Sequence, residues 1–501
     1  MRLTTPGLSG AHPPISSPYG ASLALRCLAA AALLGPVAAQ GQQSQTVAIT
    51  VGTIHTVSGA DITDGTILIR GGKIAAVGPS SGITIPGNAQ VLRYPEGHAY
   101  PGLVDALSAA YAPPVEIINA QINAGTDFFD ALNPGDETSR TVIRHGITTA
   151  YVSNRSSAPW RGLGAIIRPH GEGFTTLGDK LHGGLGLRAT TGPAAGHALD
   201  RLVRFEGLSK AFDSVEVYQK KLADYEKALE QYDKDFTAYL DHYRRGGRAD
   251  QDAGAGRRGG AGRRGSGQGR RGQRGRGQRG QGQRGRGQRG QGRRGQDATQ
   301  GEADAAPTKP DRPAKVKPDP SQEALLRVVN GEVPLRVEAH RVDEIRAALA
   351  LATAKGIPGI TLEFGTEAGD IAEEIAAAGT PVVITDLLPG SLASYEMKRN
   401  GKLPAVLHRA GVPVAIASGS LENSRNLTLM AAYACGQGLP EDVAVRAITL
   451  TPAEILGVAD QVGSLEQDKI ADILITSGPL LQSDTRILRV VSRSRTWHEV
   501  K

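Results

Sequence analysis

The central part of the chain alternates short apolar runs with stretches whose apolar residues recur every three or four positions. Runs of the first kind include residues 147–152, 357–362, 381–385 and 412–417, and stretches of the second kind include 342–355 and 368–378. Near-continuous apolar strands separated by amphipathic helices favour a parallel sheet that is covered by helices. The number of units fits a distorted (β/α)8 barrel better than a doubly wound sheet, because no glycine-rich phosphate loop opens any unit.

Both ends of the chain are rich in β-forming residues. Residues 66–70 and 73–78 flank Gly71-Gly72, which predicts a strand, a tight turn and a second strand. Residues 471–476 and 487–491 form two more such runs. We therefore expect a small composite β-sandwich from residues 46–99 and 460–501, attached to a barrel that spans residues 100–459.

A long insert interrupts the barrel region. Residues 205–243 are charged and helical in pattern, which is typical of a solvated helix with one apolar stripe. Residues 244–301 consist largely of Arg-Gly-Gln and Arg-Arg-Gly units, and a run rich in Pro and Lys follows up to residue 320. Between Tyr243 and Val316 no apolar residue is larger than Ala, so we expect residues 244–320 to be disordered.

The N-terminus has the pattern of a secretory signal peptide. An apolar run from Cys27 to Leu34 follows Arg26, and Val37-Ala38-Ala39 places small residues before a cleavage site at the end of residues 1–39. The run is too short for a membrane anchor, which is the alternative. Export to the periplasm or the extracellular space would leave Cys435 as the remaining cysteine, and its small apolar neighbours indicate a buried, inert thiol.

The positive charge of the chain is concentrated in the insert. Residues 257–294 contain fourteen Arg and no acidic residue, which leaves −7 for the other residues because the whole chain carries +7. The segment lacks the interleaved aromatic residues of RNA-binding repeats, and export would separate it from RNA, so we expect no nucleic-acid partner. An anionic envelope polymer or lipid is one candidate partner for residues 244–301. The acidic body of the chain and no partner at all are the alternatives.

Several motifs in a fixed order carry a family resemblance. They are Pro101-Gly102-Leu103-Val104-Asp105, Gly146-Ile147-Thr148-Thr149, Glu363-Phe364-Gly365-Thr366-Glu367-Ala368, Thr451-Pro452-Ala453-Glu454-Ile455-Leu456-Gly457, and the segment Gly463–Asp472. Together they resemble the amidohydrolase superfamily, and its imidazolonepropionase-like branch above all, across residues 46–500 apart from the insert. The resemblance implies a TIM barrel, a zinc ion, and hydrolysis of carbon–nitrogen bonds other than peptide bonds.

The same resemblance indicates that the metal site is degenerate. The family pattern continues after Asp105 as x-His-x-His, but this chain has Leu107 and Ala109 at the two histidine positions. Phe364 stands where the histidine of strand six is expected, and Gly419 where the aspartate of strand eight is expected. His340, at the strand-five position, is the only one of these ligand positions that keeps its residue.

One imidazole cannot hold zinc tightly, because catalytic zinc sites need about three protein ligands. His170, His182 and Asp386 follow predicted strands and are the other residues that we consider as ligands. Structural or surface roles fit them better, since none lies at a ligand position of the family pattern.

Three functional hypotheses remain open. The first is a metal-free pseudoenzyme or ligand-binding barrel, with no cofactor and a small molecule in the barrel mouth. The second is a hydrolase of non-peptide carbon–nitrogen bonds that uses a non-standard site, with zinc as its cofactor. The third is an envelope-associated scaffold that binds anionic polymers through its Arg-rich loop.

Overall fold

The computed structural model describes residues 46–112, 123–154, 158–177, 187–190, 198–245, 308–385, 387–388 and 400–500. The expected signal peptide and most of the Arg-rich insert lie outside these residues. Two compact units divide the chain, one made of Met1–Ser209 with Arg327–Lys501 and one made of Lys210–Leu326. Among the described residues, no helix has both the length and the apolar character needed to cross a membrane.

Strands from both ends of the chain form one sheet in the first unit. Its order is β17-β16-β15-β4-β1-β2-β3. The strands are β1 (Val47–Ile54), β2 (Ile62–Arg70), β3 (Lys73–Pro79), β4 (Gln90–Pro101), β15 (Asp472–Thr476), β16 (Ile487–Ser492) and β17 (Arg495–Glu499). β4 joins the two groups, because it runs parallel to β1 and antiparallel to β15. Backbone hydrogen bonding joins all seven strands, from both ends of the chain, into a single sheet around one apolar core.

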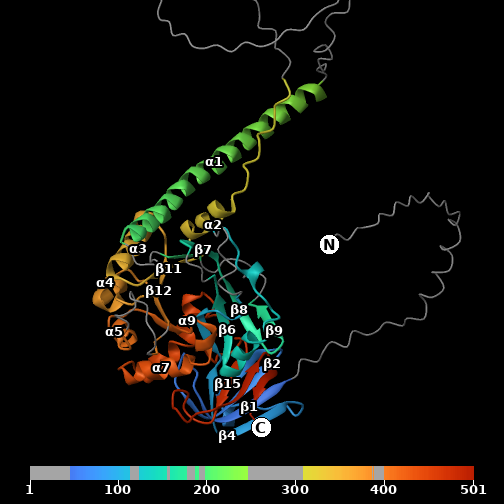
Figure 1. The fold of residues 1–501 in the computed structure, drawn as a ribbon. Coiled ribbons are helices and arrows are strands. Elements are labelled where there is room, and N and C mark those ends of the chain that lie inside the picture. Colours follow the sequence, from blue (N-terminus) through green and yellow to red (C-terminus); the bar gives the residue numbers. More distant parts are fainter. Residues whose placement is uncertain are drawn as a thin grey trace, which may run out of the picture. The chain divides into compact units, whose positions relative to one another are not determined.

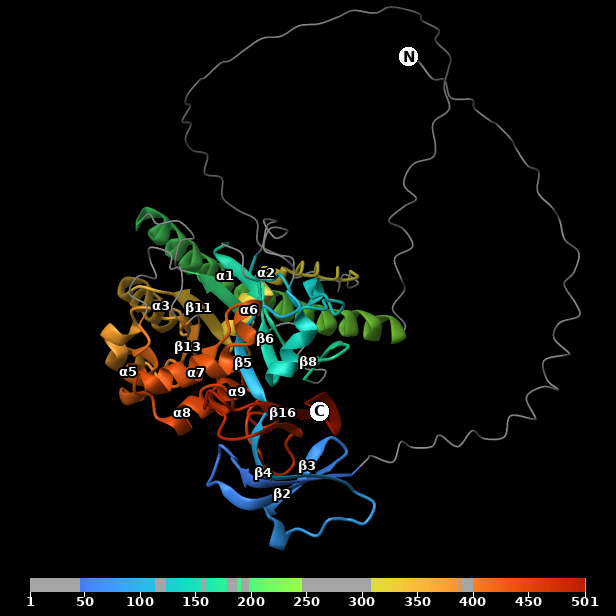
Figure 2. The ribbon, with the colours of Figure 1, turned by 60° about the horizontal axis from the view of Figure 1, so that its bottom comes forward.

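β4 leads directly into the second strand system of this unit. Gly102 separates Pro101 at the end of β4 from β5 (Leu103–Ser108). A Cβ atom on Gly102 would lie 2.1 Å from the Thr148 hydroxyl oxygen, so only glycine allows this close approach. Figure 2 shows β4 passing from the sheet of β2 and β3 toward β5 and β6.

Two further sheets contain the strands that alternate with helices. One has the order β5-β6-β8-β9 and the other β14-β13-β12-β11-β10-β7. The strands after β5 are β6 (Ile147–Val152), β7 (Trp160–Leu163), β8 (Ala165–His170), β9 (Gly173–Thr176), β10 (Leu187–Thr190), β11 (Leu335–Ala339), β12 (Ile360–Phe364), β13 (Val382–Thr385) and β14 (Val414–Ala417). β5 and β6 are parallel, and so are β10 to β14, while β7, β8 and β9 pair antiparallel.

Helices follow the strands of the longer sheet (Figure 1). They are α3 (Val342–Ala354), α4 (Ala372–Ala377), α5 (Leu403–Arg409), α6 (Leu421–Ser424), α7 (Leu427–Gly436), α8 (Glu441–Arg446) and α9 (Leu450–Ile455). All residues of β6, β13 and β14 are buried, which explains why these strands are mostly apolar. The expected α/β fold class is therefore confirmed.

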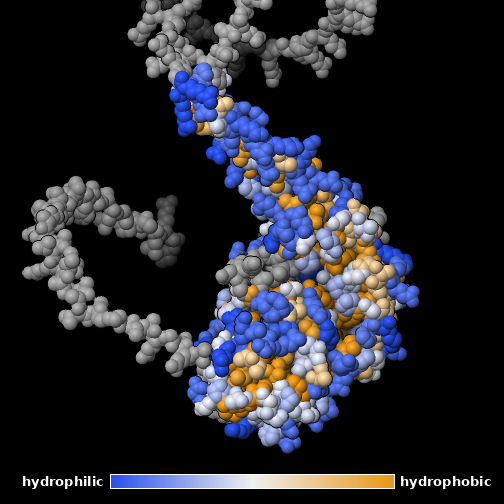
Figure 3. Space-filling model, turned by 180° about the vertical axis from the view of Figure 1, so that it is seen from behind, coloured by the Kyte–Doolittle hydropathy of each residue, from blue (hydrophilic) through white to orange (hydrophobic). Residues whose placement is uncertain are grey.

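The second unit is built on the long helix α1 (Ala198–Arg244), with the start of α2 (Pro320–Val329). Along α1 from Leu222 to Tyr239, the side chains that are not fully exposed recur at alternating intervals of three and four residues. These residues are Leu222, Tyr225, Leu229, Tyr232, Phe236 and Tyr239. Figure 3 shows apolar patches at intervals along this helix among hydrophilic side chains. A repeat of 3.5 residues indicates one continuous seam that faces a long partner.

Residues 308–319 supply part of that partner. They form neither helix nor strand, and the half-buried positions among them are Pro310, Pro313 and Val316, while the residues between are exposed. A three-residue period without backbone ladders is the pattern of a polyproline II helix. The segment runs beside α1, and both line a cavity of about 950 Å³ that includes Tyr218 and Tyr225 (Figure 1).

This arrangement differs from the disorder that we expected over residues 244–320. Arg244 ends α1, residues 308–319 pack along the helix, and Pro320 begins α2. Proline restricts the unfolded chain, so an extended segment with apolar groups on one face loses little entropy when it docks on tyrosine rings. Residues 246–307 lie outside the described residues.

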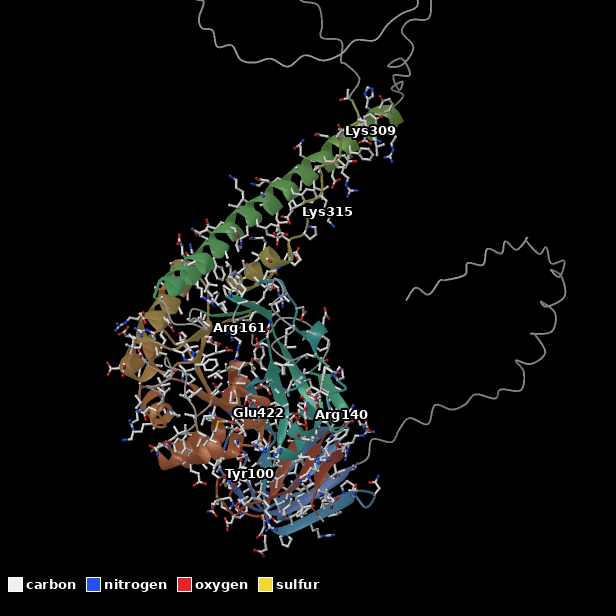
Figure 4. The ribbon with its side chains drawn as sticks, in the orientation of Figure 1. Tyr100, Arg140, Arg161, Lys309, Lys315 and Glu422 are labelled. Atoms are coloured by element: carbon white, nitrogen blue, oxygen red, sulfur yellow. The ribbon has the colours of Figure 1, made fainter. Side chains whose placement is uncertain are left out.

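The packing of this segment on α1 predicts a difference between two neighbouring substitutions. Val316→Asn places an amide against the tyrosine seam and should raise the rate of proteinase K cleavage within residues 308–319 several-fold, because the segment detaches more often. Lys315→Asn is the matched control, since Lys315 is exposed (Figure 4). Cleavage sites are mapped by mass spectrometry. Equal cleavage of the two variants would contradict the packing.

Candidate functional site

The ligand positions suggested by the sequence follow the carboxyl ends of parallel strands. Leu107 lies at the end of β5, Phe364 ends β12, and His340 and Gly419 follow β11 and β14. β11, β12 and β14 share one sheet, and a hydrogen bond from the Gly419 amide to the Leu107 carbonyl joins the end of β5 to β14, so the fold places the four positions around one mouth. Leu107 is buried and packs in the cluster of Val104, Ala415 and other apolar residues, so this side chain belongs to the core. Ala109 follows β5 and carries no group that could bind a metal.

Asp105 connects the first and last of these strands. Its carboxylate is fully buried and accepts hydrogen bonds from the Ser418 amide at 2.9 Å and the Ser418 hydroxyl at 2.5 Å. The Gly419 amide donates to the carbonyl oxygen of Leu107 at 2.8 Å. Burial raises the pKa of Asp105 to about 6, although the hydrogen bonds from Ser418 lower it. The carboxylate is therefore a buried link between β5 and the end of β14.

The backbone at Gly419 leaves no room for the aspartate of the family pattern. Gly419 has a φ of +65°, in the left-handed region that favours glycine. A Cβ atom at this position would lie 2.8 Å from the Cβ atom of Thr385, at the end of β13. Any side chain would thus require both a strained backbone and a shift of β13.

The motif Glu363–Ala368 holds His340 in place. His340 is buried, and its Nδ1 atom lies 2.8 Å from the Thr366 hydroxyl oxygen. The Glu367 amide donates to the His340 carbonyl at 2.8 Å, and the ring centroids of His340 and Phe364 are 4.9 Å apart. Phe364 itself has a φ of +70°, an outlier for an aromatic residue. The surviving imidazole therefore packs beside a phenyl ring where the family pattern has a second imidazole.

Two ion pairs each include a residue of β11, the strand that ends just before His340. Arg336 and Glu363 are both fully buried, and their Nε and Oε1 atoms are 2.7 Å apart. The Arg336 guanidinium also donates to the Ala106 carbonyl at 2.8 Å and lies 4.2 Å from the centre of the Tyr151 ring. Arg161 of β7 (Figure 4) pairs with Glu338 at 2.5 Å, and both side chains are largely buried.

These ion pairs balance two adjacent acids. Glu338 and Glu363 are cross-strand neighbours in the pairing of β11 with β12. Like charges in such positions repel, and each carboxylate here has its own guanidinium. The sequence motifs did not predict this cluster. The available signal was charged residues at 336 and 338, alternating with apolar ones in a strand that is otherwise buried.

Several buried polar atoms near this cluster have no hydrogen-bond partner among the described residues. They include Nη1 of Arg336 and the hydroxyl oxygens of Thr149 and Ser153. Thr149 lies on β6 two residues before Tyr151, so it shares the face of the ring that stacks on Arg336, and Ser153 follows directly after the end of β6. Unpartnered buried donors of this kind call for an explanation, such as a bound molecule or water.

The other candidate ligands lie away from the mouth or outside the described residues. The His170 ring stacks on Trp497 of β17, with centroids 5.2 Å apart, so it packs against the terminal sheet. Burial lowers the pKa of His170. His182 and Asp386 fall in segments that the structure does not describe. Among the residues that it does describe, no group of three His, Cys, Asp or Glu side chains could hold a metal ion.

Among the described residues, the ligand positions of the family pattern offer few groups for a divalent metal. Leu107 and Ala109 offer no ligand atom, a Cβ atom at Gly419 would clash with Thr385, and Glu338 and Glu363 are paired with arginines. What the arrangement can do is bind: its buried guanidinium and hydroxyl groups can orient a polar molecule.

Comparisons with known proteins agree with this fold. A model of the amidohydrolase family matches residues 333–497. Imidazolonepropionase of Pseudomonas putida is 34% identical over 149 residues, which are 28% of this chain and 35% of that protein. Imidazolonepropionase of Mesorhizobium japonicum is 32% identical over 148 residues, which are 28% of this chain and 34% of that protein. The chain thus matches about a third of the length of these relatives.

A solved structure covers far more of the chain. The crystal structure of an amidohydrolase from Thermotoga maritima has a TM-score of 0.65 and 20% sequence identity, over 91% of this chain and 100% of that one. At this identity the likeness establishes a common fold.

The raised pKa of Asp105 predicts a specific dependence of stability on pH. Its folded-state pKa of about 6 exceeds the ordinary value of 3.8, so the folded state holds the proton more tightly. The stability from this group is fully present below pH 3.8 and is lost as pH rises through about 6, by at most about 1.4 kcal/mol per pH unit.

Asp105→Asn should remove this component, because an amide does not titrate and can keep both contacts with Ser418. Urea unfolding between pH 4 and 7 measures the effect. The variant should lose less stability than the wild type as pH rises across this window. The same slope in both proteins would show that the Asp105 carboxyl is not perturbed.

Proposed function

Since the chain belongs to the amidohydrolase superfamily, in its imidazolonepropionase-like branch, we propose that its barrel mouth binds a small polar molecule without a catalytic metal. In this proposal the chain is a pseudoenzyme that keeps the fold and uses the mouth for recognition. The molecule offers at least one hydrogen-bond acceptor, because the Arg336 guanidinium can only donate, whereas the Thr149 and Ser153 hydroxyls can donate or accept.

The observation that carries the metal-free part of the proposal is the backbone at Gly419. The family pattern has an aspartate there, and hydrolysis in this superfamily uses such a carboxylate to take a proton from the attacking water. Gly419 has a φ of +65°, and a Cβ atom there would lie only 2.8 Å from the Thr385 Cβ atom. Both the backbone at residue 419 and the neighbouring Thr385 therefore oppose an aspartate at this position. A change of one side chain would not restore this position.

The ligand-binding part rests on Arg336 and the face of β6. The Arg336 guanidinium is held by Glu363, by the Ala106 carbonyl and by the Tyr151 ring, which leaves Nη1 without a hydrogen-bond partner among the described residues. A planar cation that is held on three sides is pre-organised to accept a carboxylate, carbonyl or similar acceptor on the fourth. The buried hydroxyl of Thr149 on β6, and that of Ser153 just after this strand, also have no hydrogen-bond partner among the described residues.

A hydrolase with a non-standard zinc site is the alternative that the family favours. The two proposals differ in how the chain handles zinc. A hydrolase of this superfamily would hold about one zinc per chain, and His340 is the surviving ligand that would contribute to the site.

Metal analysis of the purified full-length chain distinguishes the two. We expect well below one zinc per chain, and a zinc affinity in calorimetric titration that does not change in the His340→Ala variant. The variant serves as the control for zinc bound weakly by other surface groups. One zinc per chain that is lost in His340→Ala would overturn the metal-free proposal and favour the hydrolase.

A further inference from the structure

A separate cavity of about 710 Å³ lies in the first unit, where the terminal sheet meets α8. Its walls come from the loop after β1, the end of β4, the helix α8 and the loop after β15. Figure 4 shows Tyr100, which lines this cavity, well away from Arg161, which marks the charge cluster of the barrel. The volume falls within the range of small-molecule sites in proteins.

A stack of rings forms one wall of the cavity. Tyr100 is buried, with 3% of its surface exposed, and its ring stacks on that of His55 at a centroid distance of 4.2 Å. His55 is held at both ring nitrogens, since Nδ1 lies 2.8 Å from an Asp61 carboxylate oxygen and Nε2 lies 2.9 Å from Nδ1 of His98. The Tyr100 hydroxyl accepts a hydrogen bond from the Leu480 amide at 3.1 Å. It keeps a second lone pair that can accept from a molecule in the cavity.

The polar lining of the cavity is predominantly acidic. Asp61, Glu441 and Asp442 contribute three carboxylates, whereas the one cation in the lining, Arg446, pairs with Glu454 at 2.5 Å. The negative charges of these acids also affect the pKa of the Tyr100 hydroxyl. Burial is the main cause that raises the pKa of Tyr100 to about 12, and the charges of Asp61 and Glu441 raise it further. Carboxylates from two separate segments thus act on the same ring wall.

The spacing of these acids favours an organic cation over a metal ion. The acids are spread around a cavity, and in the part of the chain that the structure describes no three such side chains are close enough to share a metal ion. A larger cation can meet them one at a time. Val57, Val443, Val445 and Pro479 provide apolar wall for a methylene chain.

We propose that this cavity is a binding site for a small aliphatic ammonium or guanidinium compound. One cationic group meets Asp61 and the Tyr100 hydroxyl, the carbon chain lies along the valines, and the acids of α8 meet the cationic group or a second one. The face of the aromatic wall favours a cation as well. Nothing in the amidohydrolase resemblance assigns a ligand to this cavity.

Calorimetric titration of the full-length chain with 1,5-diaminopentane tests the proposal. Two probes of the same chain length serve as ligand controls: neutral 1,5-pentanediol and the dianion glutarate. We expect the diamine to bind, with an affinity at least tenfold higher than either control. No binding of the diamine, or equal binding of the diol, would overturn the proposal.

A matched pair of double variants locates the binding. Glu441→Gln/Asp442→Asn removes two carboxylates at the start of α8 and should weaken diamine binding about tenfold or more. Asp370→Asn/Glu373→Gln removes two carboxylates that also lie at the start of a helix and border a different cavity, of about 560 Å³. This control should bind like the wild type. Equal losses in the two variants would mean a general electrostatic effect and would overturn the site.

Tyr100→Phe tests the ring wall separately from the acids. The substitution keeps the stacking on His55 and removes the hydroxyl, so the diamine affinity should fall several-fold. Thermal unfolding of each variant shows that it is folded before titration. A Tyr100→Phe variant that is folded and binds with unchanged affinity would overturn the placement of the cationic group beside Tyr100.

Discussion

The buried contact of Asp105 with Ser418 is the interaction on which the barrel mouth depends. It joins residues 313 positions apart in the chain and links β5 to the end of β14. A buried carboxylate loses its hydration, so it needs hydrogen-bond donors within the protein. The Ser418 amide and hydroxyl are these donors. Once Ser418 is held in this way, the next residue must turn back toward Leu107, and only glycine adopts that turn without strain.

In the metal-free proposal, this constraint accompanies other departures from the family pattern. A metal site needs an acid at the end of β14 and imidazoles at the ends of β5 and β12, all aimed at one ion. Here the end of β14 is a glycine beside Thr385, Leu107 belongs to the apolar core, and Phe364 packs on His340. Two acids on the neighbouring strands β11 and β12 are balanced within the protein, because Arg161 and Arg336 pair with Glu338 and Glu363. A buried pair of this kind contributes little net stability, but breaking it would cost about 3–5 kcal/mol.

Much of the fold could be predicted from local pattern. The strand expected at residues 147–152 is β6 with the same bounds, and the turn expected at Gly71-Gly72 joins β2 to β3 with both glycines at positive φ. These elements depend on apolar runs and glycine, which are visible in the sequence alone. The helix expected at 368–378 is instead a short 3-10 turn followed by α4 (Ala372–Ala377), because its pattern does not reveal where the first turn tightens.

The missed features depend on contacts between distant segments. The sequence shows Gly419, but its φ and the approach of Thr385 come from the packing of β13 on β14. The Arg336–Glu363 pair likewise requires the register of β11 with β12. The apolar stripe of α1 was expected from the sequence, yet the residues that pack along it, Pro310, Pro313 and Val316, follow only from the return of the chain along the helix. Local pattern therefore identified the elements, and tertiary contacts decided the site.

The unfolding free energy of Gly419→Asp tests the central claim most directly, with Gly356→Asp as its reference. Gly356 has a φ of +61° but nothing within 4 Å of a Cβ position, so its variant reports backbone strain alone. We predict that Gly419→Asp is less stable than Gly356→Asp by about 1–3 kcal/mol or more, because it adds the clash with Thr385. Equal stability of the two variants would show that the mouth accommodates the acid, and it would contradict the account of a barrel closed to its metal site.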